Sequence, residues 1–150
     1  MALKDQINDQ IKKAMLAKNK ERLRALRAVK SLILLAESEK GAEGELSEEK
    51  EMELLMKAVK QRKDSAAIYE EQNRPELKET EEFEISVLEE FLPKQVSDEE
   101  LKAGIEDIIA RVGAESPKDM GKVMGPSIKK FAGQAEGKRI SDMVKQLLNA

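Results

Sequence analysis

The sequence gathers six basic side chains in one short stretch near its end, between residues 116 and 139, where only two acidic residues accompany them. These basic residues are Lys118, Lys122, Lys129, Lys130, Lys138 and Arg139. Clustered lysine and arginine side chains attract phosphate, and the free N–H groups at a helix start also favour an anion. We therefore predict these six as RNA-binding candidates. The alternative is a small helical hairpin whose glycines allow close packing.

A second basic patch is predicted on two facing helices, formed by Arg27, Lys30, Lys60 and Arg62. Facing lysines and arginines can hold phosphate together, although most runs of charge only face solvent. Arg62 interrupts an apolar stripe on its helix, and Glu81 interrupts the stripe on the next one. These two residues either pair across antiparallel helices or extend their charged ends to the solvent.

Several kinds of chemistry are excluded by composition. The chain has no cysteine and no histidine, which rules out thiolate and imidazole catalysis, disulfides and the usual zinc ligands. Its glycines do not have the spacing of a phosphate-binding loop. We predict no catalytic residue, no metal site and no cofactor. Because only 3% of residues are aromatic, RNA would be recognised by shape and backbone rather than by base stacking.

Apolar residues recur at helical spacing along the whole chain, which predicts an all-α protein. The expected helices span about 3–14, 21–38, 48–72, 75–92, 97–112, 116–131 and 140–148. Ser47 and Ser97 have the character of N-caps, and Pro75 suits a first helical position. The run SLILLA at 31–36 is apolar on more than one side, so its helix should have two neighbours. A loop is expected at 41–44.

The tail combines several local signals. Ser116 and Pro117 predict a helix start, and an apolar face follows at Met120, Val123, Met124, Ile128 and Phe131. Pro126 predicts a kink or break at 124–125, because proline removes a helical hydrogen bond. Small residues at 133, 135 and 137 then predict a tight, exposed turn.

Two subdomains are predicted, an N-terminal helical bundle at 1–95 and a three-helix tail at 96–150. The sequence LPKQ at 92–95 separates them, since the residue before proline leaves the helical region and a fresh capping box follows at 97–100.

Five segments carry a resemblance to a known family. They are DMGKVMG at 119–125, GQAEGKR at 133–139, LRALRAVKSLI at 23–33, KAVKQRKDSAAIYEEQNRPEL at 57–77 and EISVLEEFLPKQVSDEEL at 84–101. In order and spacing they resemble the GatB/YqeY family, and in particular its stand-alone YqeY-like branch. The tail resembles the tail domain of the aspartyl/glutamyl-tRNA amidotransferase B subunit.

The resemblance implies a role in holding transfer RNA, carried here by Lys122, Lys138 and Arg139. The catalytic portion of the amidotransferase subunit has no counterpart in this chain, so a label of carbon–nitrogen ligase with glutamine as amide donor would rest on homology alone. We predict a non-catalytic tRNA-binding or amidotransferase-related accessory module. One alternative is an adaptor that docks on an aminoacyl-tRNA synthetase or amidotransferase, and another is an accessory enzyme in glutamine-dependent amidation.

The N-terminal residues alternate charged and apolar types, and no apolar run approaches the roughly 20 residues that span a bilayer. We therefore expect a soluble cytoplasmic protein without a membrane partner. The net charge of −3 is unevenly spread, since residues 12–30 hold eight basic residues and one glutamate. A basic surface on an acidic protein is compatible with that distribution.

Overall fold

The computed structural model describes residues 2–39 and 46–149, and within them the chain is entirely helical, as predicted. The loop expected at 41–44 lies outside the described residues. Two compact units are present, residues 1–92 and 93–150. The elements are α1 (Leu3–Leu16), α2 (Lys20–Glu39), α3 (Glu48–Glu71), α4 (Pro75–Glu89), α5 (Asp98–Val112), the 3-10 turn η2 (Pro117–Asp119), α6 (Met120–Lys130) and α7 (Gly137–Leu148).

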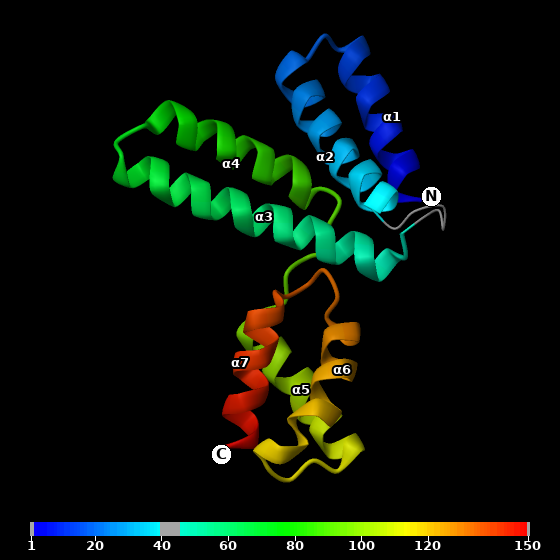
Figure 1. Ribbon diagram of the computed structural model, residues 1–150, viewed down its shortest axis with the longest axis vertical. Coiled ribbons are helices and arrows are strands. Elements are labelled where there is room, and N and C mark those ends of the chain that lie inside the picture. The colour runs from blue at the N-terminus through cyan, green and yellow to red at the C-terminus, as the bar shows by residue number, and fades with distance from the viewer. Residues whose placement is uncertain (1, 40–45, 150) are drawn as a thin grey trace. The chain divides into compact units, whose positions relative to one another are not determined.

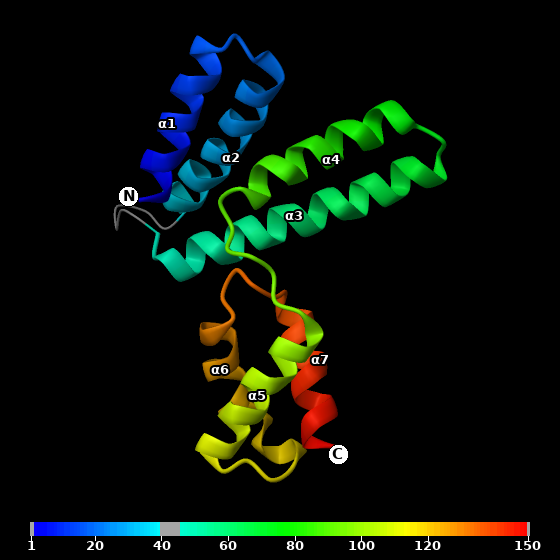
Figure 2. The same ribbon diagram turned by 180° about the vertical axis from the view of Figure 1, so that it is seen from behind.

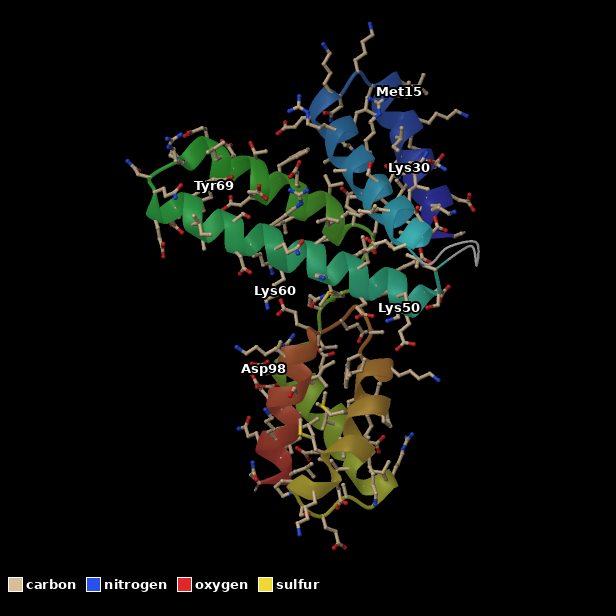
Figure 3. The ribbon with its side chains drawn as sticks, in the orientation of Figure 1. Met15, Lys30, Lys50, Lys60, Tyr69 and Asp98 are labelled. Carbon is tan, nitrogen blue, oxygen red and sulfur yellow. The ribbon has the colours of Figure 1, made fainter. Side chains whose placement is uncertain are left out.

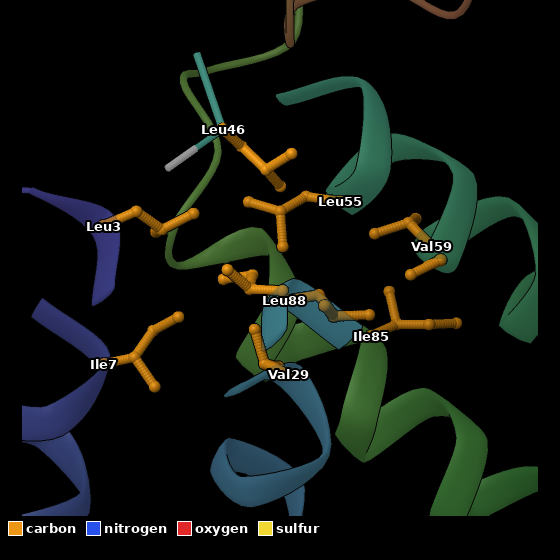
Figure 4. Close-up of a cluster of buried hydrophobic side chains, with 10 residues drawn as sticks. Leu3, Ile7, Val29, Leu46, Leu55, Val59, Ile85 and Leu88 are labelled. Carbon is orange, nitrogen blue, oxygen red and sulfur yellow. The ribbon is translucent and has the colours of Figure 1, made fainter. Parts of the chain in front are cut away.

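The first unit consists of two antiparallel helical hairpins, α1 with α2 and α3 with α4 (Figure 1). All four helices contribute to one aliphatic core, shown in Figure 4. Its labelled members are Leu3, Ile7, Val29, Leu46, Leu55, Val59, Ile85 and Leu88. Burial of such side chains stabilises a fold by about 1.5–3 kcal/mol each relative to exposure, so this core holds the two hairpins together.

Local signals place the ends of these helices where the sequence predicts them. The Ser47 hydroxyl accepts a hydrogen bond from the Lys50 N–H at 3.2 Å, and Pro75 is the first residue of α4. The chain reverses before α4 at Asn73, whose φ of 57° is left-handed. Asparagine tolerates that region better than most residues, which makes the tight hairpin accessible.

Helix α2 contacts α1, α3 and α4, which confirms the prediction of more than one neighbour. Its second apolar side is nevertheless not covered by those neighbours. Leu34 is 47% exposed and Leu35 is 60% exposed, whereas Ile33 is buried. The run SLILLA therefore has one buried face and one apolar face in solvent.

The second unit is a bundle of α5, α6 and α7, and Figure 2 shows α5 in front of and between the other two. Ser97 caps α5 by accepting from the Glu100 N–H at 3.1 Å, and Gly113 ends α5 with a left-handed φ of 68°. The core is again aliphatic, with Phe131 as its aromatic member. The ring of Phe131 covers Gly104 so closely that a Cβ there would overlap Phe131 Cζ.

Of the kink or break predicted at 124–125 in α6, the break is wrong, and so is the place predicted for Ile128. The helix runs through Pro126 from Met120 to Lys130 without a break, and the irregular turn lies earlier, at η2. Pro126 has no N–H and therefore removes one hydrogen bond from the helix. Burial of Val123 and Ser127 against neighbouring helices keeps this segment helical. Ile128, predicted to face the core, is 42% exposed. The neighbouring Ser127 is buried instead.

The turn at residues 131–136 is also not the exposed loop that the glycine pattern predicts. Gly133 has the expected positive φ, 76°, but both Gly133 and Ala135 are buried. The segment that opens the second unit lies against this turn. Gln95 Nε2 donates to the Gly133 carbonyl at 2.8 Å, and the Val96 N–H donates to the Gln134 carbonyl at 3.1 Å.

Candidate nucleic-acid interface

Three of the predicted lysines form a single line along η2 and α6. Lys118, Lys122 and Lys129 follow one another at offsets of four and seven residues, which places them on one face of the helical segment. All three are exposed. We call these residues the lysine stripe. By the helical rise the stripe extends over about 17 Å, enough to follow several phosphates of a nucleic-acid strand.

The start of the stripe is fixed by Asp119. Its carboxylate accepts a hydrogen bond from the Glu115 N–H at 2.9 Å and lies 3.7 Å from the Lys122 ammonium. The hydrogen bond from Glu115 and, after it, the charge of Lys122 lower the pKa of Asp119 below its usual range. Lys122 is thus positioned by a solvent-exposed ion pair, which leaves its ammonium accessible.

The surface of α6 beside the lysine stripe carries two glycines, which have no side chain to project from the helix. Gly121 and Gly125 are exposed, and a methyl group added to either would meet no protein atom within 4 Å. Glycine inside a helix costs about 0.5–1 kcal/mol relative to alanine. Gly125 directly precedes Pro126, whose ring disfavours the helical conformation for a residue that has a Cβ, so the proline favours glycine at this position, whereas no packing contact requires glycine at Gly121. A partner backbone could therefore approach α6 closely here.

The other basic candidates of the tail differ in the contacts that their charged groups make. Lys130 Nζ lies 4.0 Å from the Asp107 carboxylate and 5.8 Å from the centre of the Phe131 ring. Lys138 is exposed in the first turn of α7. Near that helix start its ammonium adds to the positive end of the helix dipole.

The Arg139 side chain makes two hydrogen bonds within the second unit that the sequence does not reveal. Its Nη2 nitrogen donates to the Val96 carbonyl at 2.7 Å and to the Asp98 carboxylate at 2.9 Å. The guanidinium therefore ties the first turn of α7 to the segment that leads into α5. Arg139 thus already contacts two acceptors, whereas Lys118 and Lys129 of the lysine stripe have no carboxylate within ion-pair distance among the described residues.

The second predicted patch does not have four free cations. The Arg62 guanidinium contacts the carboxylates of Glu81, at 3.2 Å, and Glu84. This decides the open question in favour of pairing across α3 and α4, with a second carboxylate that the sequence did not single out. Arg27 and Lys60 are exposed and Lys30 is half-buried. Figure 3 shows Lys30 on α2 and Lys60 on the edge of α3.

Within residues 2–39 and 46–149, the histidine-free and cysteine-free chain shows no group of three carboxylates that could hold a metal ion. In that same part of the chain, no helix has the length and apolar character needed to cross a bilayer. The exposed lysines of the second unit remain the candidate site.

The model of the YqeY-like protein family matches residues 4–148, which is nearly the whole chain. The chain belongs to this YqeY-like family. This confirms the resemblance seen in the five sequence segments. The match includes both structural units and every residue of the lysine stripe.

A curated relative of this YqeY-like chain is the mitochondrial protein "Altered inheritance of mitochondria protein 41" of Clavispora lusitaniae strain ATCC 42720. The two are 33% identical over 115 residues, which cover 75% of this chain and 66% of the relative. The chain therefore spans slightly less than two thirds of that protein's length. The relative's name places it in mitochondria, so a cytoplasmic location stays a prediction for the present protein.

Proposed function

We propose that this protein is a non-catalytic RNA-binding module that holds structured RNA, with transfer RNA as the first candidate. The lysine stripe carries the proposal, because it aligns three exposed lysines on one helix face, of which only Lys122 pairs with a carboxylate, that of Asp119, among the described residues. Recognition would use phosphates, since lysine heads are point charges and the surface offers few aromatic side chains for stacking.

The exposed glycines support the same reading. With Gly125 between Lys122 and Lys129, the centre of the stripe has no side chain that would hold a phosphate backbone away from the helix. Contacts of this kind give affinity and position but little sequence preference. The module would then favour folded RNA over single strands because of backbone shape rather than base identity.

The test is a titration of fluorescently labelled total tRNA with the full chain, at several salt concentrations between about 25 and 200 mM. For each phosphate that a lysine neutralises, the slope of log K against log salt changes by about one. Replacing Lys118, Lys122 and Lys129 together with alanine should therefore flatten this slope by roughly two to three.

A matched control removes the same charge elsewhere. Lys57, Lys63 and Lys102 are exposed and lie outside both predicted basic sets, so their triple alanine variant should retain most of the slope and affinity. Absence of binding at low salt would refute the proposal, as would an equal loss in the control variant. Release of ammonia from glutamine by the purified chain would instead support the accessory-enzyme alternative.

A further inference from the structure

The turn that joins α1 to α2 is both basic and apolar. Residues 12–20 read KKAMLAKNK, with four lysines and no acidic residue, and we call them the hairpin tip. At its centre Leu16 is 80% exposed and Met15 is 54% exposed. Figure 3 shows Met15 near the end of the hairpin, where several side chains with nitrogen ends project into solvent.

The fold of the first unit does not use these two apolar side chains. Helix α1 buries Leu3, Ile7 and Ala14, and the chain turns directly after Leu16. A single exposed apolar residue is ordinary on a protein surface. Two adjacent exposed apolar residues at a turn, surrounded by lysines, form a small apolar surface whose exposure to water is unfavourable. A partner with both apolar and anionic groups would cover it.

The backbone of the hairpin tip is held in one conformation. Lys18 has a left-handed φ of 57°, which residues with side chains adopt rarely. Its N–H donates to the Met15 carbonyl at 3.1 Å, and the Asn19 N–H donates to the Ala14 carbonyl at 3.0 Å. Asn19 Oδ1 in turn accepts from the Arg22 N–H. The apolar and cationic groups are thus presented together on a fixed turn.

The lysines of the hairpin tip keep most of their charge available. Lys13 pairs with Asp9 at 3.1 Å. Among the described residues, no carboxylate lies within ion-pair distance of Lys12, Lys18 or Lys20. The hairpin tip therefore presents uncompensated positive charge around its two apolar side chains.

We propose that the hairpin tip binds the surface of a bilayer that contains anionic phospholipids. Leu16 and Met15 would enter the interfacial region, and the surrounding lysines would contact lipid phosphates. Structured RNA matches the lysines but offers no apolar environment for Leu16. The combination of both kinds of group on one turn favours lipid.

This proposal departs from the expectation that the protein has no membrane partner. That expectation rested on the lack of a membrane-spanning segment, and binding at the surface requires none. The proposal is also independent of the lysine stripe, because it uses residues of the first unit only.

The experiment is co-sedimentation of the full chain with vesicles of phosphatidylcholine alone or with about 30% phosphatidylglycerol, at low and at physiological salt. We expect binding to the anionic vesicles and little to the neutral ones. Each lysine near an anionic surface strengthens binding roughly fivefold, so Lys18→Ser with Lys20→Ser should weaken it about 25-fold at low salt. Met15→Ser with Leu16→Ser should weaken it about tenfold at both salts, because apolar burial is not screened.

Leu34→Ser with Leu35→Ser is the matched control, because these side chains are comparably exposed but lie outside the hairpin tip. This control variant should bind anionic vesicles like the unmodified chain. Equal binding to neutral vesicles, no binding to either kind, or an equal loss in the control would overturn the proposal. So would a Met15 and Leu16 variant that keeps vesicle binding but loses tRNA binding, since the hairpin tip would then be an RNA contact.

Discussion

The contact between Gly104 and Phe131 makes a quantitative prediction about the second unit. A Cβ at Gly104 would overlap Phe131 Cζ and lie 3.0 Å from Cε2, while the ring is itself buried in the core. Gly104→Ala therefore forces the ring to move by about 1 Å in a packed interior, and overpacking of this kind costs about 1–3 kcal/mol.

Part of that cost is offset, because alanine is favoured over glycine inside a helix by about 0.8–1 kcal/mol. The net expectation for Gly104→Ala is a loss of about 0–2 kcal/mol. In a unit of this size each lost kcal/mol corresponds to a fall in melting temperature of roughly 4–8 °C. Gly121→Ala is the matched control in α6: its new methyl meets no packed side chain within 4 Å and no proline follows it, so the same helix preference should stabilise the unit by about 0.5–1 kcal/mol.

The assay is urea unfolding of the full chain, followed by NMR signals of residues in the second unit. Signals specific to that unit are needed because two units need not unfold together. A second substitution, Phe131→Leu, should couple to Gly104→Ala by about 0.5–2 kcal/mol in a double-mutant cycle, since it removes the overlap. If Gly104→Ala stabilised the unit as much as Gly121→Ala, the ring could not lie where the structure places it.

Three further predictions concern charged groups. Arg139→Ala should destabilise the second unit by about 1 kcal/mol in the same urea assay, because two acceptors lose their donor, whereas exposed Lys138→Ala should change it by less than about 0.5 kcal/mol. Arg62→Met should destabilise the first unit by about 1–3 kcal/mol, because it leaves two partly buried carboxylates of α4 without their cation; a change below about 0.5 kcal/mol would count against this. The Asp119 carboxyl should titrate in NMR below the usual aspartate pKa. Since the pKa of Asp119 is lowered in the folded state, its carboxylate stabilises the second unit at pH values above the unfolded-state pKa. This stabilisation disappears as the pH falls through the folded-state pKa. Asp119→Asn should remove that pH dependence of the unfolding free energy.

Gly121 connects stability to the proposed function. If RNA approaches the helix at this glycine, Gly121→Ala should raise the stability of the second unit and lower the affinity for tRNA, while Gly104→Ala lowers stability alone. An affinity unchanged in the stabilised variant would show that the backbone of α6 is not approached there.

Much of the fold could be predicted because its signals act over a few residues. Ser47, Ser97 and Gly113 fix helix ends through bonds or backbone angles within their own turns. Apolar spacing likewise reports which face of α1 or α7 is buried. The exposure of the lysine stripe also follows from its position off the apolar face of α6, so the candidate site could be anticipated from composition and spacing.

The sequence alone therefore determined the helical elements, the excluded chemistries and the family resemblance. Tertiary structure decided which cations remain free and which small residues are buried. Arg139 finds its acceptors 41 and 43 residues away, and Arg62 finds its carboxylates 19 and 22 residues away. The same holds for Gly104 under the Phe131 ring and for Ser127 in the place expected for Ile128. These outcomes depend on how closely helices approach one another, and no local pattern records that distance.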